Sequence, residues 1–196
     1  MEICVIMSDQ SFQDSQFQPP PELLEAWERH RDIVKLGHPI LRQVARPVTR
    51  ILAPETQRLI ERMKTVMREA NGLGLAAPQV GVSQRIVVYD VHDEIQVLIN
   101  PVIQNQKGEQ LEPLEGCLSI PGLQGRVKRA LDLKVKALSQ RGRPISLRVS
   151  ELEARVIQHE IDHLDGILFI DRADPETIGW ATGSDEAEEG DPATRE

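Results

Sequence analysis

Aromatic residues, long apolar runs and cysteines are all scarce in this sequence. Aromatic residues make up only 3% of the 196 residues, so the core must be built from Val, Ile and Leu, which suits strands and a few packed helices. No apolar run approaches the ~18 residues of a membrane-spanning helix, so we expect no membrane span. The N-terminal residues lack the basic stretch and the apolar stretch that mark a signal peptide, and we therefore expect a cytoplasmic protein.

Cysteine occurs only at Cys4 and Cys117. Two cysteines could form one disulfide, but cytosolic proteins rarely keep such a bridge. A disulfide is therefore the less favoured interpretation.

The negative charge is concentrated at one end of the chain. A content of 40% hydrophobic and 28% charged residues is typical of a globular protein, and the length suffices for one sizeable domain. The net charge is −8, and residues 171–196 hold nine acidic side chains against Arg172 and Arg195, which leaves the preceding residues near −1. Such an acidic end disfavours nucleic-acid binding, so we expect no specific DNA partner.

The composition divides the chain into three parts. Residues 1–31 are rich in Ser, Gln and Pro, with a short amphipathic patch at residues 22–30, and we expect a flexible N-terminal extension that is largely disordered or only loosely docked. Residues 32–170 carry the periodic patterns and the motifs described below, so we expect them to form the catalytic domain. Residues 171–196 are rich in Gly, Asp, Glu and Ala, which predicts an unstructured acidic tail.

Residues 158–166, QHEIDHLDG, contain the pattern H-E-x-x-H. On a helix, His159 and His163 lie one turn apart on the same face, close enough to bind one metal ion. Ser150 is the predicted N-cap of this helix, and Glu153 completes a capping box. A second stripe of the same helix can face a core: Ile157, Ile161 and Leu164. We therefore predict one helix that carries a metal site.

The rest of the folded domain reads as one further helix and a set of strands. A helix is predicted over residues 51–70, with Pro54 near its start and Gly72 as the left-handed residue after its end. Alternating apolar and polar residues predict strands over residues 85–90, 96–99, 110–114, 125–127, 131–138 and 145–149. A helix, several antiparallel strands and then the metal helix indicate an α+β domain.

The residue that completes the metal site decides the chemistry. One class of zinc peptidases needs a third histidine where this chain has Phe169, and another needs a Glu on a later helix, where this chain has its acidic end. Cys117 is the attractive third ligand, because a thiolate with two imidazoles leaves a fourth position open, as catalytic metals require. An isolated cysteine is, however, more often a small buried hydrophobe, and these residues alone leave the choice open.

Three segments together resemble the signature motifs of the peptide deformylase family: residues 72–79 (GLGLAAPQ), 115–119 (EGCLS) and 158–163 (QHEIDH). They occur in that family's order and with similar intervals, over roughly residues 33–170. The resemblance implies an α+β fold with antiparallel β-sheets packed around a central metal-binding helix. It also implies removal of the formyl group from the N-terminal N-formylmethionine of nascent polypeptides, with release of formate.

The resemblance further implies one divalent metal ion per chain, held by Cys117, His159 and His163. That family generally uses Fe(II) and is often isolated with Zn(II) or Ni(II). Glu160 would take a proton from the attacking water and deliver it to the departing amine.

Other residues of the motifs would bind and orient the substrate. The Gln79 side chain and the Leu118 backbone N–H would stabilise the oxyanion. Leu73 and Gly74 would pair with the substrate backbone as an added strand, and Gly116 would permit close approach beside the metal. From helical spacing alone, Leu152 and Val156 continue the histidine stripe, so they would line a methionine pocket or pack in the core.

Two other functions use the same H-E-x-x-H pattern. An H-E-x-x-H zinc peptidase would cut unformylated peptides internally, but it leaves residues 72–79 unexplained. A structural metal site would need a fourth protein ligand, and the spare candidates form no metal-spaced cluster: Cys4, His30, His38 and His92. The expected partners are N-formylmethionyl nascent peptides, with a transient contact to the ribosome that the acidic end does not favour.

Overall fold

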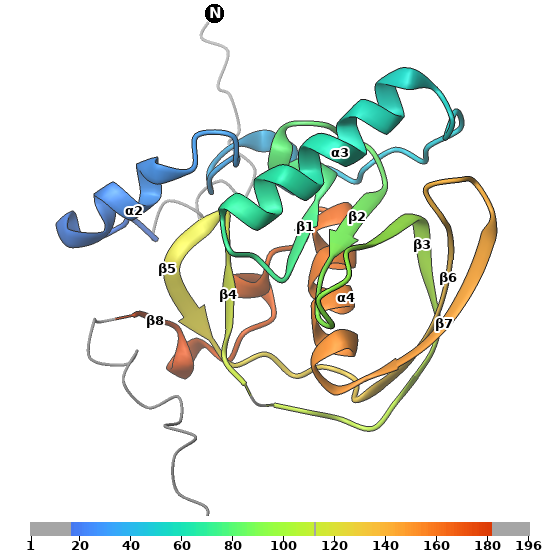
Figure 1. Cartoon of the computed structure of the whole chain (residues 1–196). Coiled ribbons are helices and arrows are strands. Elements are labelled where there is room, and N and C mark those ends of the chain that lie inside the picture. Colours follow the sequence, from blue (N-terminus) through green and yellow to red (C-terminus); the bar gives the residue numbers. More distant parts are fainter. Residues whose placement is uncertain (1–16, 112, 182–196) are drawn as a thin grey trace, which may run out of the picture.

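The computed structural model describes residues 17–111 and 113–181, in which two antiparallel sheets surround helix α4 (Glu151–Leu164) (Figure 1). One sheet has five strands in the order β1-β2-β3-β6-β7, and the other has three in the order β4-β5-β8. The strands of the larger sheet are β1 (Gly74–Ala76), β2 (Ile86–Tyr89), β3 (Gln96–Lys107), β6 (Asp132–Leu138) and β7 (Pro144–Ser150). Those of the smaller sheet are β4 (Glu115–Cys117), β5 (Ile120–Gly125) and β8 (Gly179–Trp180). This architecture confirms the predicted α+β class.

Two further α-helices and five short 3-10 helices complete the described elements. Helix α3 (Pro54–Glu69) and the six-residue helix α2 (Leu24–Arg29) are the α-helices. The short helices are η1 (Pro21–Leu23), η2 (Pro39–Arg42), η3 (Ala77–Val80), η4 (Phe169–Asp171) and η5 (Pro175–Thr177).

Strand β2 lies between the two long helices and is buried on both faces. Successive side chains of a strand point to opposite faces, so Ile86 and Val88 face α3, whereas Val87 and Tyr89 face α4. A shift of the β2 register by one residue would therefore turn the side chains that face one core toward the other core.

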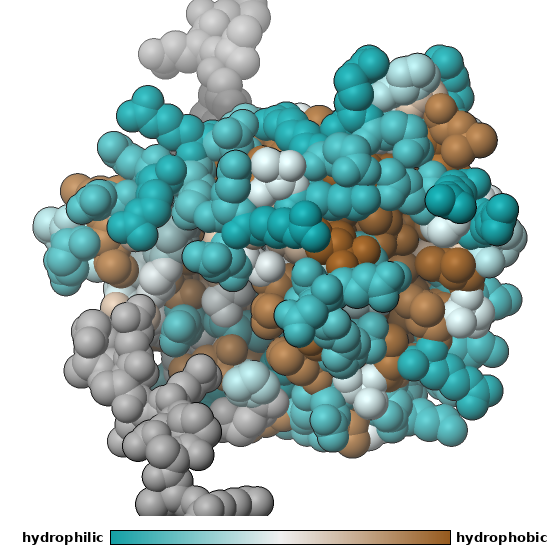
Figure 2. All heavy atoms as spheres, in the orientation of Figure 1, coloured by the Kyte–Doolittle hydropathy of each residue, from teal (hydrophilic) through white to brown (hydrophobic). Residues whose placement is uncertain are grey.

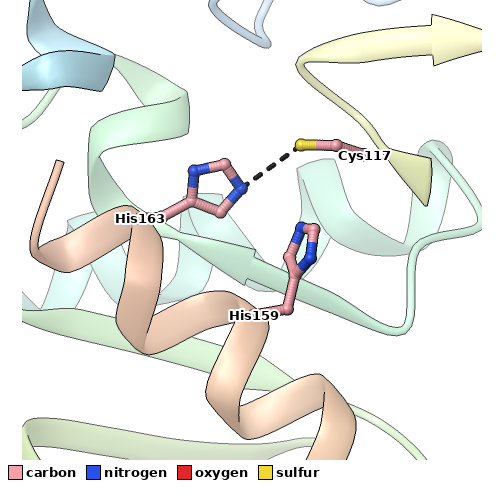
Figure 3. Close-up of side chains that lie close together, drawn as sticks. All are labelled: Cys117, His159 and His163. Atoms are coloured by element: carbon pink, nitrogen blue, oxygen red, sulfur yellow. Dashed lines mark hydrogen bonds between the residues drawn. The ribbon is translucent and has the colours of Figure 1, made fainter. Parts of the chain in front are cut away.

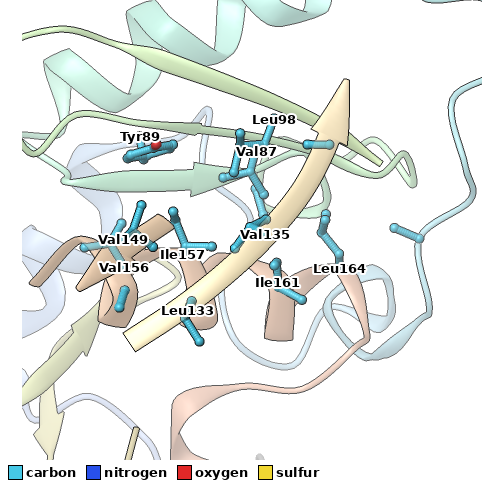
Figure 4. Packing of buried hydrophobic residues seen from close by; sticks show 14 residues of the cluster. Val87, Tyr89, Leu98, Leu133, Val135, Val149, Val156, Ile157, Ile161 and Leu164 are labelled. Atoms are coloured by element: carbon cyan, nitrogen blue, oxygen red, sulfur yellow. The ribbon is translucent and has the colours of Figure 1, made fainter. Parts of the chain in front are cut away.

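The core around α4 is the one that positions the metal helix. Figure 4 shows side chains of α4 packed against β2, β3 and β6: Val156, Ile157, Ile161 and Leu164 of the helix lie against Val87, Leu98, Leu133 and Val135. Burying each such side chain contributes about 1.5–3 kcal/mol. The apolar stripe predicted for α4 thus fixes the rotation of the helix about its axis and the direction of its other face.

Several predicted details were wrong. Ser150 is the N-cap of α4, but its side chain makes no capping hydrogen bond, and Glu153 instead accepts one from Tyr89 Oη at 2.9 Å. After α3 the left-handed residue is Asn71 (φ 52°), not Gly72.

The predicted strand boundaries also need correction. Residues 110–114 hold no strand among the described positions, apart from an isolated bridge between Gln110 and Arg129. Leu111 and Leu114 are exposed, so this segment has no core to face. The strand predicted over residues 125–127 lies earlier, as β5. Strands β1 and β4 were missed because three residues are too few to show an alternation.

The segments predicted to flank the catalytic domain include defined elements. Helix α2 contacts β5, and β8 pairs with β5 through Leu123–Trp180 and Gln124–Gly179. The predicted extension and tail also include residues 1–16 and 182–196, which lie outside the described part, as does Cys4. The predicted domain boundaries therefore stay a prediction. Among the described helices none is long and apolar enough to cross a membrane.

Candidate active site

His159 and His163 lie on the face of α4 opposite its apolar stripe, one turn apart. Their ring centroids are 5.0 Å apart, and the rings meet edge to face. Both side chains are buried or nearly so, with 1% exposure for His163 as a whole. The i, i+4 spacing of the sequence therefore becomes a pair of converging imidazoles in the folded chain.

Cys117 approaches the two histidines from the end of β4 in the smaller sheet, and Figure 3 shows its side chain pointing toward them. Its Sγ lies 3.2 Å from His163 Nε2, and the ligand atoms of the three residues all lie within 4.8 Å of one another. The β4–β5 pairing shifts register between Gly116 and Cys117. A bulge of this kind re-aims a side chain, which accounts for a cysteine at a strand end that points into the site.

These three residues fit a divalent transition metal. One thiolate and two imidazoles form a donor set for Zn, Fe or Ni with room for a further ligand. His159 Nδ1 lies 3.1 Å from Glu115 Oε2, which leaves Nε2 as the nitrogen of that ring that can bind a metal ion. No other cluster of this kind occurs in the described part of the chain.

Glu115 holds His159 in place and is itself held by two buried arginines. Arg129 donates two hydrogen bonds of 2.8 Å to its two oxygens, and Arg155 donates one of 2.7 Å. Burial raises the pKa of Glu115, but the hydrogen bonds from Arg129 and His159 outweigh it and bring the pKa to about 2. Glu115 is therefore a stable anion that accepts a hydrogen bond from the Nδ1–H of His159.

The same network extends along α4 to Asp162. Arg129 also donates to Asp162, and Arg172 donates to Asp162 through two hydrogen bonds of 2.7 and 2.8 Å. Sequence reasoning assigned no role to these residues, although Glu115 and Asp162 lie inside the quoted motifs. The sequence around each of the three arginines gives no sign of these contacts, because the partners come from other segments of the chain. The residues are Arg129, Arg155 and Arg172.

Glu160 is buried beside the three ligand residues, and Gly74 makes room for its carboxylate. A Cβ on Gly74 would lie 2.8 Å from Glu160 Cδ, closer than any real side chain allows. Burial raises the pKa of Glu160 to about 7. Such a carboxylate can both accept and donate a proton near neutral pH.

Gln79 points its amide group at the same region. Its Oε1 accepts a hydrogen bond of 2.8 Å from the Ala76 backbone N–H, which orients the side chain. Its Nε2 donates to Ser119 Oγ at 3.3 Å and lies 3.6 Å from Cys117 Sγ. Leu118 follows Cys117 directly, and its side chain covers Gly72.

A cavity of about 620 Å³ opens beside the cluster, between the edge strands β1 and β4. The cavity brings together all the residues that the sequence predicted to bind substrate: Leu73, Gly74, Gly116, Leu152 and Val156. Leu73, Leu114 and Leu152 are exposed at its rim, at 48%, 45% and 39%. Figure 2 shows hydrophobic patches among the polar residues on the face in view. The cavity therefore joins an apolar rim to a buried polar floor.

Comparison with known proteins gives a consistent result. The sequence model of the polypeptide deformylase family matches residues 30–178. The chain is 48% identical to the peptide deformylase of Carboxydothermus hydrogenoformans over 142 residues. These residues make up 72% of this chain and 92% of that protein.

Solved structures agree with this assignment. A peptide deformylase from Synechococcus elongatus in complex with actinonin superimposes with a TM-score of 0.70 at 45% identity, over 73% of this chain and 78% of that one. A Met-Ala-Ser-bound peptide deformylase from Acinetobacter baumannii gives a TM-score of 0.69 at 35% identity, over 71% and 96%. This chain therefore belongs to the polypeptide deformylase family, metal-dependent hydrolases that remove the N-terminal formyl group from nascent peptides.

Proposed function

We propose that Cys117, His159 and His163 are the ligands of the catalytic metal and that Glu160 is the proton-transfer group of the deformylation reaction. The convergence of the three ligand atoms within 4.8 Å, beside a buried carboxylate, is the observation that supports this assignment most strongly. A divalent ion bound there supplies Lewis-acid chemistry, which activates water as a nucleophile at neutral pH.

The side chains around the cluster supply the remaining steps. Glu160 accepts a proton from the attacking water and donates it to the departing amine. The Gln79 amide and the Leu118 backbone N–H donate hydrogen bonds to the oxygen of the formyl group as negative charge develops on it. Glu115 keeps the imidazole of His159 in one orientation throughout, so the ligand set does not reorganise during the reaction.

The peptide binds between the two edge strands. β1 has a free edge on one side, so the backbone around Leu73 and Gly74 can add the substrate as a further strand. Gly116 has no side chain, so the substrate peptide can pass close to β4. The methionine side chain packs against Leu152 and Val156, one and two turns before the histidines on α4. Val156 also belongs to the core around α4, so both roles inferred from its helical position are served at once.

We propose Fe(II) as the physiological metal, with Zn(II) or Ni(II) as the ions that purification in air would retain. The substrates are N-formylmethionyl nascent peptides, met in the cytoplasm during a transient contact with the ribosome. An internal peptidase, the earlier alternative, is not retained because the family match covers the whole site.

The test is formate release from formyl-Met-Ala-Ser by protein purified anaerobically and loaded separately with Fe(II), Ni(II) or Zn(II). Formate in proportion to bound metal, with Fe(II) or Ni(II) far above Zn(II), is the expected result. Metallated protein that releases no formate would overturn the assignment of the ligands to catalysis. A ranking with Zn(II) first would overturn the proposal of Fe(II).

A further inference from the structure

Helix α2 contributes to the wall of the substrate cavity. Ala26 and Arg29, together with His30 just after the helix, line the cavity opposite α4. Ala26 and Arg29 precede the segment that the family model matches, which begins at residue 30. This part of the wall is therefore a property of this chain rather than of the matched family segment.

The helix is fixed to the catalytic domain at both of its ends. Leu23, just before α2, occupies the space beside Gly122 of β5, where a Cβ would lie 2.5 Å from Leu23 Cδ1. At the other end, Lys35 Nζ donates a hydrogen bond of 2.8 Å to the His30 carbonyl.

Trp27 anchors the middle of α2. Its ring lies 6.3 Å from that of Trp180 on β8, and it packs on the core cluster that includes Ile120 and Leu123 of β5. Figure 1 shows α2 beside β5 in agreement with these contacts. The helix is thus packed as part of the domain, and the wall that it forms has a defined position.

The charges of the cavity divide into an inner and an outer group. Inside, Glu115 is neutralised by Arg129 and Arg155, which donate hydrogen bonds of 2.7–2.8 Å to it. Outside, Arg29 is exposed, and no described residue forms an ion pair with its guanidinium. The rim near α2 therefore presents the exposed guanidinium of Arg29 to whatever extends out of the cavity, on a helix that also carries Glu25 and Glu28.

We propose that α2 is the outer wall of the peptide groove and that Arg29 favours substrates with carboxylate side chains shortly after the formylmethionine. This inference rests on the proposed function, because it takes the occupant of the cavity to be an extended formyl peptide. A cavity of about 620 Å³ accommodates a ligand of several residues, so the peptide reaches beyond its first residue toward the rim. A guanidinium there can bind a carboxylate through two hydrogen bonds.

The test compares kcat/KM for two peptides, formyl-Met-Ala-Glu-Glu amide and formyl-Met-Ala-Lys-Lys amide. We expect the wild-type enzyme to prefer the acidic peptide and Arg29→Glu to lower the acidic-to-basic ratio by about tenfold at low salt. The matched control is Arg31→Glu, which makes the same change of charge two residues away at an exposed position that does not line the cavity. Its ratio should stay near that of the wild type, and Arg29→Gln should fall between the two.

The outcomes separate the two proposals. Equal ratios in Arg29→Glu and Arg31→Glu, with formate still released, would overturn the role of Arg29 and leave the deformylase assignment intact. A wild-type enzyme that releases formate from neither peptide would overturn both. Since Arg29 is exposed and unpaired among the described residues, its variants should keep the wild-type melting temperature.

Discussion

At the scale of single residues, Gly74 decides where the carboxylate of Glu160 can lie. The motif that contains Gly74 predicted a close approach by the substrate backbone, but the structure shows that the side chain of Glu160 also uses the space. A methyl group at this position would overlap the end of Glu160. With the roles proposed above, the glycine would serve both the position of Glu160 and the close approach of the substrate.

Gly74→Ala is expected to lower kcat by about 100-fold, because a shift of about 1 Å in a catalytic group costs that much. Metal content should stay unchanged, since no ligand moves. Gly179→Ala is the matched control, because a Cβ there meets nothing within 4 Å. Formate release together with metal analysis checks both variants. An unchanged kcat in Gly74→Ala would show that Glu160 can act from another position.

Glu160→Ala should keep the metal and lose turnover by roughly 10² to 10⁴, the usual contribution of a general acid and base. Cys117→Ser should instead bind the metal more weakly than the wild type, which competition with a chelator measures. If Glu160→Ala keeps its activity, the proton-transfer role is wrong. If Cys117→Ser retains metal as the wild type does, the ligand assignment is wrong.

At the scale of elements, α4 is held by aliphatic packing on one face and by a buried charge network on the other. Its amphipathic pattern made the helix predictable, because the period of 3.6 residues is local to the sequence. The network was not predictable in the same way. Arg129 enters it from the segment before β6, and nothing near Arg129 in the sequence indicates that it contacts both Glu115 and Asp162.

Arg129→Met is expected to destabilise the fold by about 3–5 kcal/mol, because it leaves two buried carboxylates without their shared partner. Metal affinity should fall about 10- to 100-fold as well, since Glu115 orients His159. Lys128→Met is the control: its one ion pair with a described residue is an exposed contact of 3.4 Å with Glu109, worth at most about 1 kcal/mol. Denaturant unfolding measures both variants, and equal losses would rule out a special role for the network.

At the scale of the whole molecule, segments from both ends of the described chain meet on the smaller sheet. From the C-terminal end, β8 pairs with β5, and the Ala181 N–H donates a hydrogen bond of 2.7 Å to the Gly122 carbonyl. α2 packs on the same sheet from the other end. Composition placed both segments outside the folded domain, because their few apolar residues are dispersed among polar ones.

Truncation after Ala181 keeps every described helix and strand, so we expect it to leave activity on formyl-Met-Ala-Ser and the melting temperature near the wild-type values. Truncation after Asp171 also removes β8, Trp180 and Arg172. It should lower the melting temperature by several degrees, given about 2–4 °C for each kcal/mol in a protein of this size. Equal melting temperatures for the two truncations would show that β8 adds nothing to the fold.

The sequence by itself determined the metal helix, the aliphatic cores and the three motifs, because helical and strand periodicities and residue spacing are local properties. Only the tertiary structure decided how Cys117, Glu115 and Arg129 meet α4, since these contacts depend on strand pairing between distant segments. The same holds for Arg29: in the sequence it is one charged residue in a polar extension, and only the packing of α2 on β5 places it at the cavity. Local patterns fix which side chains an element carries, whereas long-range packing fixes which of them share a site.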